Sequence, residues 1–285
     1  MYSTGIFKIQ KVTIEYTKYN EPIYLIPFGD VHRNAPLCHE KKWLEFLNWA
    51  KKKKNAYFLG MGDYQEFSSA SSRMKLRSIG LHDSELDIIE KTNRTQTEKL
   101  AKELGFMNGR LIGFIEGNHY GEMKNGTTTT QYMAQLLETN YLGTCSFIRL
   151  YFHNPQRNTS NSIDIFAHHG KGAARLIGGS LNKVQQMIEG VEADIYLQGH
   201  DHKKSVGLIT RLHLSQTRDL VLKHKKVLVA RTGSFLKGYE DGQSSYVVDA
   251  MLSPTDLGVI KIELTPKREA RNGDDYSYID IHASL

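Results

Sequence analysis

Five short turns carry the residue types that bind metal ions in proteins. They read Gly29-Asp-Val-His32, Gly62-Asp63, Gly117-Asn-His119, His168-His169-Gly170 and Gly199-His-Asp-His202. Imidazole, carboxylate and amide oxygen form a mixed N/O ligand set without sulfur, which suits Mn, Fe, Zn, Co or Ni better than Ca or Cu(I). Six of the 12 histidines fall in these turns, a concentration that scattered surface histidines do not explain. The five turns together indicate one metal site.

Each of these turns follows a segment that the apolar pattern predicts to be a β-strand. The predicted strands are 24–28, 56–59, 111–115, 163–167 and 194–197. In open α/β sheets, ligands bind at the carboxyl ends of the strands. The five turns can therefore converge on one site, although they are far apart in the sequence.

The remaining pattern predicts an α/β domain whose helices alternate with strands in the first two-thirds of the chain. Helical spacing or capping signals mark residues 39–53, a segment from Ser84 to about Gly105, 129–139 and 180–189. Further strands are predicted at 6–16, 146–152, 205–214, 220–230, 245–252 and 258–264. We expect a single domain over residues 1–285, with a polar C-terminal tail at about 266–285.

The composition is that of an ordinary soluble globular protein, with 40% hydrophobic and 24% charged residues in a chain of 285. No apolar run is long enough for a membrane-spanning helix. Because the N-terminal residues lack the apolar core of a signal peptide, we expect a cytoplasmic protein without a membrane partner. Cys38 and Cys145 lie in no C-x-x-C pattern and are interpreted as plain thiols. The net charge of +6 suits an anionic partner, such as a phosphate ester or nucleic acid, without establishing one.

The order Asp-x-His, Gly-Asp, Gly-Asn-His, His-Gly and Gly-His-x-His resembles the calcineurin-like metallophosphoesterase superfamily. The motifs extend from residue 30 to residue 202, and Arg231-Thr-Gly-Ser-Phe235 looks like the closing strands of that family. The resemblance implies a four-layer αββα sandwich with a dinuclear metal site at one edge of the sheets. It also implies a metal-dependent phosphoric ester hydrolase.

The resemblance further assigns the metal ligands. Asp30, His32, Asp63 and His202 would hold the first metal, and Asp63 would bridge to the second. Asn118, His200 and one histidine of the His168–His169 pair would complete the second site. The ligand commonly precedes glycine, which favours His169, but some members use the first histidine of such a pair, so His168 is the alternative. The expected cofactors are two divalent transition-metal ions, Mn, Fe or Zn.

Two such ions hold a bridging hydroxide that attacks phosphorus. His119 resembles the non-ligating histidine that stabilises the phosphoryl oxygens and protonates the leaving group. Glu66 stands three residues after Asp63, where it would orient His119 or be a solvated loop residue. Tyr120 replaces the acidic residue that often follows Gly-Asn-His, and Phe67-Ser68 replaces the Arg-Gly of protein phosphatases. These departures argue against a close relative of protein Ser/Thr phosphatases and, with the basic balance, favour phosphodiesters of nucleotides or nucleic acid.

The segment from Ser68 to Arg77 is Ser-rich, and its Arg73, Lys75 and Arg77 recur at every second residue. We expect a loop whose cations bind the flanking phosphates of a substrate, or else a solvated loop with incidental charge. Three other functions are consistent with the same residues: a catalytically weak binding scaffold of this fold, a phosphomonoesterase, and a nucleic-acid-binding module with structural histidines. The sequence does not specify an oligomeric state.

Overall fold

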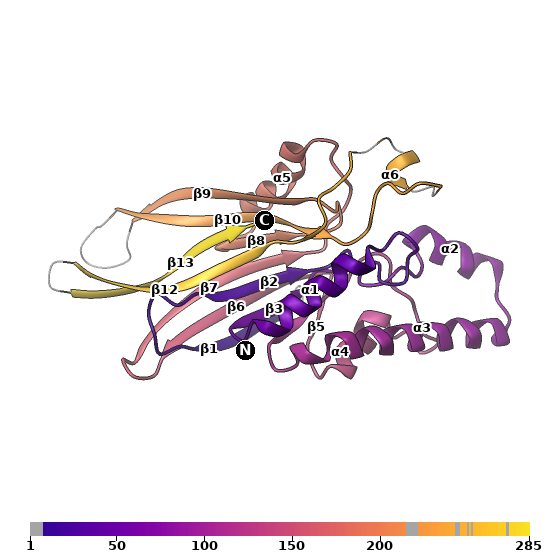
Figure 1. Ribbon diagram of the computed structural model, residues 1–285, viewed down its shortest axis with the longest axis horizontal. Coiled ribbons are helices and arrows are strands. Elements are labelled where there is room, and N and C mark those ends of the chain that lie inside the picture. The colour runs from indigo at the N-terminus through magenta and orange to yellow at the C-terminus, as the bar shows by residue number, and fades with distance from the viewer. Residues whose placement is uncertain (1–7, 215–221, 243–245, 250, 252, 272–273) are drawn as a thin grey trace.

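The computed structural model describes residues 8–214, 222–242, 246–249, 251, 253–271 and 274–285 (Figure 1). It is a mixed α/β fold in which two β-sheets face one another and helices cover their outer faces. None of the helices in these ranges is both long enough and apolar enough to cross a membrane.

The first sheet supplies three of the five turns. Its six strands, in spatial order, are β13 (Asp274–Ser284), β12 (Lys261–Arg271), β2 (Ile23–Phe28), β3 (Ala56–Gly60), β4 (Leu111–Ile115) and β5 (Tyr141–Gly143). The strands β2 to β5 are parallel neighbours. Their carboxyl ends therefore open at one edge of the sheet.

The second sheet supplies the other two turns. Its spatial order is β1 (Lys8–Glu15), β6 (Cys145–Asn154), β7 (Thr159–His168), β8 (Ile195–Gln198), β10 (Leu222–Ser234) and β11 (Gly258–Val259), with β9 (Lys204–Leu214) also paired to β10. Because β7 and β8 are parallel neighbours, the turns that follow them also lie side by side.

Three apolar clusters hold the layers together. Between the sheets lie fully buried side chains such as Leu25, Ile165 and Leu197. The helices α1 (Glu40–Lys52), α3 (Asp83–Leu104) and α4 (Thr129–Leu136) contribute to a cluster with side chains of β2, β3 and β4. On the opposite side, α5 (Ile177–Gln186) contributes to a cluster with side chains of β7, β8 and β10. The order is helices, sheet, sheet, helix.

Helix α1 illustrates how the sequence produces this packing. Its buried residues Trp43, Phe46, Leu47 and Ala50 recur at helical spacing and form one apolar stripe. The His39 side chain accepts a hydrogen bond from the Lys42 amide and so caps the first turn. The predicted helix over 39–53 is confirmed, as are the strands that precede the five turns.

The segment from Ser68 to Arg77 differs from the expected loop, because most of it lies in helix α2 (Ala70–Ile79). The Ser69 side chain caps this helix by accepting from the Ser72 amide, and Gly80 ends it with φ +70°. Helix α3 likewise begins one residue before Ser84, because the His82 amide donates to the Glu85 side chain in a capping arrangement. The serine-rich composition was interpreted as a loop, whereas one of these serines, Ser69, is the N-terminal cap of helix α2.

Two C-terminal expectations also need correction. The predicted strand at 245–252 contains the helical turn α6 (Tyr246–Asp249), while residues 245, 250 and 252 lie outside the described ranges. Residues 266–285 do not form a polar tail, because they belong largely to β12 and β13, which pair antiparallel. One face of this hairpin is buried, with Leu264, Ile279 and Ile281 in the core between the sheets. Its polar residues occupy the other face, as expected for a strand that is buried on one side.

The remaining short elements are the 3₁₀ turns η1 (Gly105–Met107) and η2 (Met187–Glu189). Cys38 and Cys145 are both free thiols. Burial raises the pKa of the Cys38 thiol to about 11, so the thiolate that nucleophilic chemistry requires is disfavoured there.

Candidate metal centre

The five turns meet at the edge where the carboxyl ends of β2, β3 and β4 face those of β7 and β8. Backbone contacts join them directly: the Asp30 amide donates to Gly62 O at 2.9 Å and the Val31 amide to Asp63 O at 2.9 Å. The two sheets are linked as well, because the His200 amide donates to Asp30 Oδ2 at 2.8 Å. The expected convergence of these turns is therefore present.

The backbone of the turns is strained at the residues that could bind metal. Asp30, His32, Asp63, His200 and His202 have φ angles of 47°, 46°, 49°, 73° and 61°. This left-handed region is uncommon for residues other than glycine and costs free energy. Since strain of this kind persists only where surrounding structure imposes it, its occurrence at five candidate ligands indicates a functional site.

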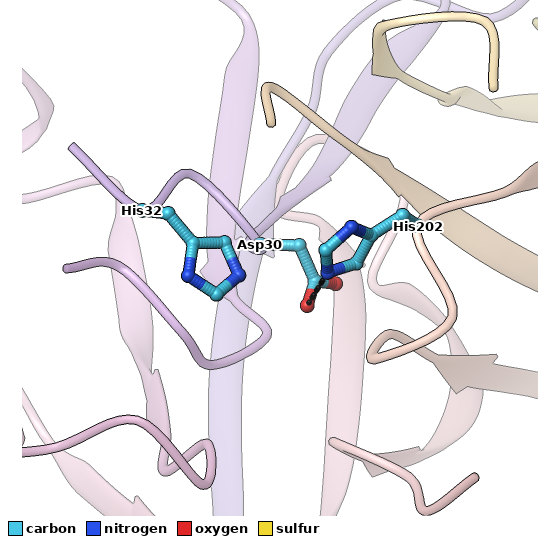
Figure 2. Close-up of side chains that lie close together, drawn as sticks. All are labelled: Asp30, His32 and His202. Carbon is cyan, nitrogen blue, oxygen red and sulfur yellow. Dashed lines mark ion pairs between the residues drawn. The ribbon is translucent and has the colours of Figure 1, made fainter. Parts of the chain in front are cut away.

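Asp30, His32 and His202 form a first cluster of potential ligands (Figure 2). Their donor atoms lie within 4.8 Å of one another, and His202 Nε2 is 3.5 Å from Asp30 Oδ1. All three side chains are buried. Within the described residues, Asp30 Oδ1 and His32 Nε2 have no hydrogen-bond partner. Buried polar atoms without partners are costly, and a cation between them would satisfy both.

A second cluster contains Asp63, Asn118, His169 and His200. His169 Nε2 lies 3.2 Å from Asp63 Oδ2 and 3.3 Å from His200 Nδ1. The amide oxygen of Asn118 lies 3.0 Å from His169 Nε2 and 2.8 Å from His200 Nδ1. The His169 Nδ1–H donates to Met61 O at 2.8 Å, which directs the Nε2 atom toward the cluster. Four nitrogen and oxygen atoms, each able to bind a metal ion, therefore lie close together in one cluster.

Asp63 belongs to this cluster and lies close to His119. Its Oδ1 accepts the His119 amide at 2.9 Å, while Oδ2 faces His169. Gly117 makes room for this carboxylate, because a Cβ at that position would be 1.9 Å from Asp63 Oδ1. The glycine of the Gly-Asn-His motif is therefore required by the close approach of Asp63.

The buried charges of the clusters shift their pKa values strongly. Burial raises the pKa of Asp30 to about 7, although the His169 charge opposes this. Burial alone would raise the pKa of Asp63, but His169 and His32 hold it well below its usual range. At His169, burial alone would lower the pKa, but the Asp63 carboxylate has the larger effect and raises the pKa to about 9. Burial lowers the pKa of His200 to about 4. The metal-free site therefore retains a proton on His169, which a metal must displace.

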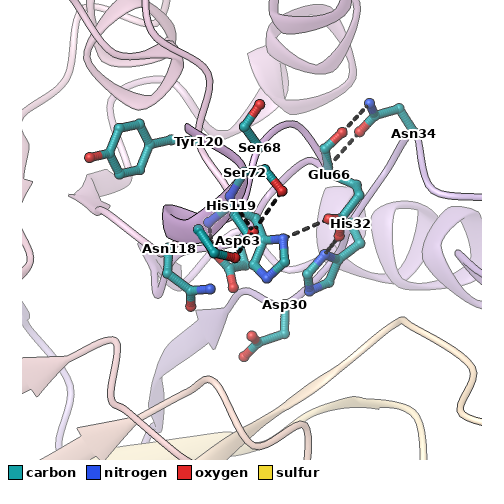
Figure 3. A network of polar contacts seen from close by, with 12 residues as sticks. Asp30, His32, Asn34, Asp63, Glu66, Ser68, Ser72, Asn118, His119 and Tyr120 are labelled. Atoms are coloured by element: carbon teal, nitrogen blue, oxygen red, sulfur yellow. Dashed lines mark hydrogen bonds and ion pairs between the residues drawn. The ribbon is translucent and has the colours of Figure 1, made fainter. Parts of the chain in front are cut away.

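Glu66 joins the metal cluster to His119 (Figure 3). Its Oε1 accepts from His119 Nδ1 at 2.6 Å and its Oε2 from His32 Nδ1 at 2.5 Å. Burial alone would raise the Glu66 pKa, but the two histidine hydrogen bonds lower it to about 2. Of the two expected positions for Glu66, the structure has the one in contact with His119. The contact with His32 was not expected.

The sequence did not predict two groups that support the site, Asn34 and the pair formed by Arg231 and Asp201. Asn34 holds the Glu66 backbone on both sides, because its Oδ1 accepts the Glu66 amide and its Nδ2 donates to Glu66 O, each at 2.7 Å. Beneath the His200–His202 turn, the buried Arg231 donates to Gly199 O at 2.8 Å and lies 3.5 Å from Asp201. Two sequence features could have indicated the Arg231–Asp201 pair: an aspartate between two histidines, and an arginine in the predicted closing strand.

The other predicted site residues that the structure describes, His168, Arg73 and Lys75, lie outside the two ligand clusters. His168 lies outside both clusters, and its Nδ1 accepts the Gly170 amide at 2.7 Å. Arg73 and Lys75 lie on helix α2, where residues two apart point in different directions, so the expected row of cations does not form. The Arg73 guanidinium binds backbone carbonyls, and Lys75 is exposed. The Arg77 side chain is outside the described part of the structure.

Comparisons with known proteins add little to this geometry. No protein-family model matches the chain, and no curated protein matches it. Among solved structures, a similar chain is vacuolar protein sorting 29 from Cryptosporidium parvum, with 12% identity and a TM-score of 0.35 over 94% of this chain and 100% of that chain. A likeness this remote does not establish a family or a function. The interpretation of the site therefore rests on its own atoms.

The adjacent histidines His168 and His169 provide a matched test of the ligand assignment. We expect His169→Ala to lower the metal content of the purified, Mn²⁺-loaded protein by about one ion per chain, because a donor of the second cluster is lost. His168→Ala should retain the wild-type content. Elemental analysis after gel filtration measures both. Loss of metal from His168→Ala alone would contradict the assignment.

The raised pKa of His169 also predicts how the metal-free protein responds to pH. A folded-state pKa of about 9, above the unfolded value of about 6.5, stabilises the fold below pH 6.5 and loses that contribution as pH rises through 9. In EDTA, we expect the free energy of unfolding to fall over this interval by on the order of 2 kcal/mol. His169→Gln should flatten the dependence and His168→Gln should keep it, as measured by urea unfolding. An unchanged slope in His169→Gln would refute the prediction.

Proposed function

We propose that this protein is a metal-dependent phosphoesterase that hydrolyses phosphodiesters of nucleotides or nucleic acid. The observation that supports the proposal most strongly is the arrangement of two ligand clusters beside a histidine that Glu66 holds in place. A solely structural site would have no need of His119, whose side chain is 25% exposed at the edge of the clusters.

The residues fit two divalent ions such as Mn, Fe or Zn. Asp30, His32 and His202 would hold one ion, and Asn118, His169 and His200 the other, with Asp63 between them. When bound, such ions supply Lewis acidity that activates water and neutralises charge on the phosphoryl oxygens. The donor set contains nitrogen and oxygen without sulfur, which is consistent with this choice of metals.

The chain's own residues would orient the substrate and move the proton. Glu66 accepts the Nδ1–H of His119, which fixes the ring and leaves Nε2 to face a bound phosphate ester. A proton on Nε2 can then pass to the departing alkoxide oxygen, a role worth typically about 10²–10⁴-fold in rate. Because Glu66 also binds His32, movement of the ligand cluster and of His119 is coupled through one carboxylate.

The preference for diesters rests on the net charge of +6 and on Phe67-Ser68 where protein phosphatases carry Arg-Gly. Phe67 is engaged in the site through its backbone, since its amide donates to His119 O at 3.2 Å. The test is a substrate panel in Mn²⁺, with aryl mono- and diesters and single- and double-stranded DNA. We expect hydrolysis of the diesters to exceed that of the monoester, and Asp63→Asn to abolish it.

A metal-loaded wild-type protein that hydrolyses none of these esters would overturn the proposal in favour of a binding scaffold. A protein that hydrolyses only the monoester would overturn the diester preference and leave the reaction type standing.

The assignment of His119 predicts a dependence on the leaving group. We expect His119→Ala to lower kcat by about 10²–10⁴-fold for diesters with alkyl leaving groups and much less for p-nitrophenolate, which departs without a proton. Metal content should be unchanged, because His119 belongs to neither of the two proposed ligand clusters. Steady-state kinetics over a series of leaving-group pKa values measures this. Equal losses across the series would exclude proton donation by His119.

A further inference from the structure

The turn from Gly117 to Tyr120, which carries Asn118 and His119, has three consecutive carbonyls that each meet a donor. The carbonyl of His119 accepts the Phe67 amide at 3.2 Å. The carbonyls on either side of it face Arg73, whose Nη1 is 3.1 Å from Asn118 O and 3.0 Å from Tyr120 O. One guanidinium therefore holds the backbone on both sides of His119.

Arg73 is also fixed at its other contacts. Its Nη1 donates to Ser68 O, just before the start of helix α2, and its Cζ lies 3.7 Å from the centroid of the Tyr120 ring. A guanidinium stacked on an aromatic face is held in one plane. Figure 3 labels Ser68, Asn118 and Tyr120, whose carbonyls or ring the arginine contacts. The arginine thereby links α2 to the turn.

The residue preceding the turn, Glu116, is held by two further hydrogen bonds. Glu116 is buried and accepts from Thr128 Oγ1 at 2.5 Å and from the Tyr141 hydroxyl at 2.8 Å. Together with the bond from the His119 amide to Asp63 Oδ1, these contacts leave the turn tied at both ends and in the middle. Arg73 is the contact that comes from helix α2.

We propose that Arg73 is a positioning residue, which acts through the backbone of the turn to hold His119 and Asn118 in place, and that it is not a contact for substrate phosphate. The inference rests on the proposed function for its catalytic consequence. Three backbone carbonyls already surround the Nη1 atom of Arg73, and its guanidinium face lies over the Tyr120 ring, so this end of the side chain is directed into the protein. Lysine would not substitute, because an ammonium group lacks the planar face with which the guanidinium stacks on the Tyr120 ring.

The chain contains a matched control for this arrangement. Arg110 also donates to backbone carbonyls, at 2.5 Å to Lys53 O and 3.4 Å to Ala56 O, and lies over the Phe58 ring. It directly precedes β4, at the end of that strand remote from the Gly117–Tyr120 turn. Arg110→Ala thus removes the same kind of contact without touching the candidate site.

The experiment compares Arg73→Ala, Arg73→Lys and Arg110→Ala in the Mn²⁺-loaded protein. For both Arg73 variants we expect kcat to fall by about 10–100-fold with KM changed less than about threefold, since small displacements of a catalytic group have effects of this size. Amide hydrogen exchange in peptides covering residues 116–120 should accelerate. Arg110→Ala should alter neither quantity. In a His119→Ala background, Arg73→Ala should lower kcat by a smaller factor than in the wild-type protein, because part of its effect acts through His119.

Three results would overturn the inference. A raised KM with unchanged kcat and unchanged exchange would make Arg73 a substrate contact. The same loss of kcat in Arg110→Ala would indicate general destabilisation. Unaltered exchange at residues 116–120 in both Arg73 variants would show that the turn does not need the arginine. If the metal-loaded wild-type protein hydrolyses no ester, the proposed function fails, and the exchange measurement alone decides the role of Arg73. Should Arg73→Ala fail to fold, Arg73→Lys and Tyr120→Leu carry the same comparison.

Discussion

The site depends on one constraint, the buried Asp63 carboxylate and its contacts with His119 and His169. One oxygen accepts the His119 amide and the other faces His169, so a single side chain fixes residues from both sheets. A buried carboxylate is costly unless opposite charge compensates it. Protonated His169 provides that charge in the metal-free protein, and a cation would provide it in the loaded one. The same demand explains Gly117, since any side chain there would displace Asp63.

The strands provide the rigidity that this arrangement requires. Five candidate ligands hold left-handed backbone conformations, and the turns that contain them are fixed by hydrogen bonds to one another. Behind the last turn, the fully buried Arg231 engages Gly199 O and the Asp201 carboxylate. Such a pair is a weak source of stability, but loss of one partner would leave a buried charge. We interpret it as a support that maintains the position of His200 and His202.

Apolar runs that end in Asp, Asn or His are local signals, and they predicted the strands, their polar turns and an α/β fold. The two-sheet architecture was implied by the resemblance of these turns to a known family. It left His168 and His169 open, since only the tertiary structure decides which ring faces Asp63. It did not indicate Asn34 or the Arg231–Asp201 pair, whose partners are brought together by folding from separate strands and turns. It misassigned the Arg73 segment, because serine enrichment resembles a loop and the cap at Ser69 became apparent only in the structure. The predicted strand at 258–264 covers the start of β12, but the rest of β12 and β13 was assigned to a polar tail because of the many polar residues on the outer face.

The proposed function depends most on two adjacent metal ions, which we propose are bound by Asp30, His32, Asp63, Asn118, His169, His200 and His202. Anomalous diffraction from crystals grown with Mn²⁺, recorded near the manganese absorption edge, tests it most directly. We predict two peaks about 3.5–4 Å apart, one at each ligand cluster, with the Asp63 carboxylate between them. A single peak, or peaks away from these residues, would contradict the account.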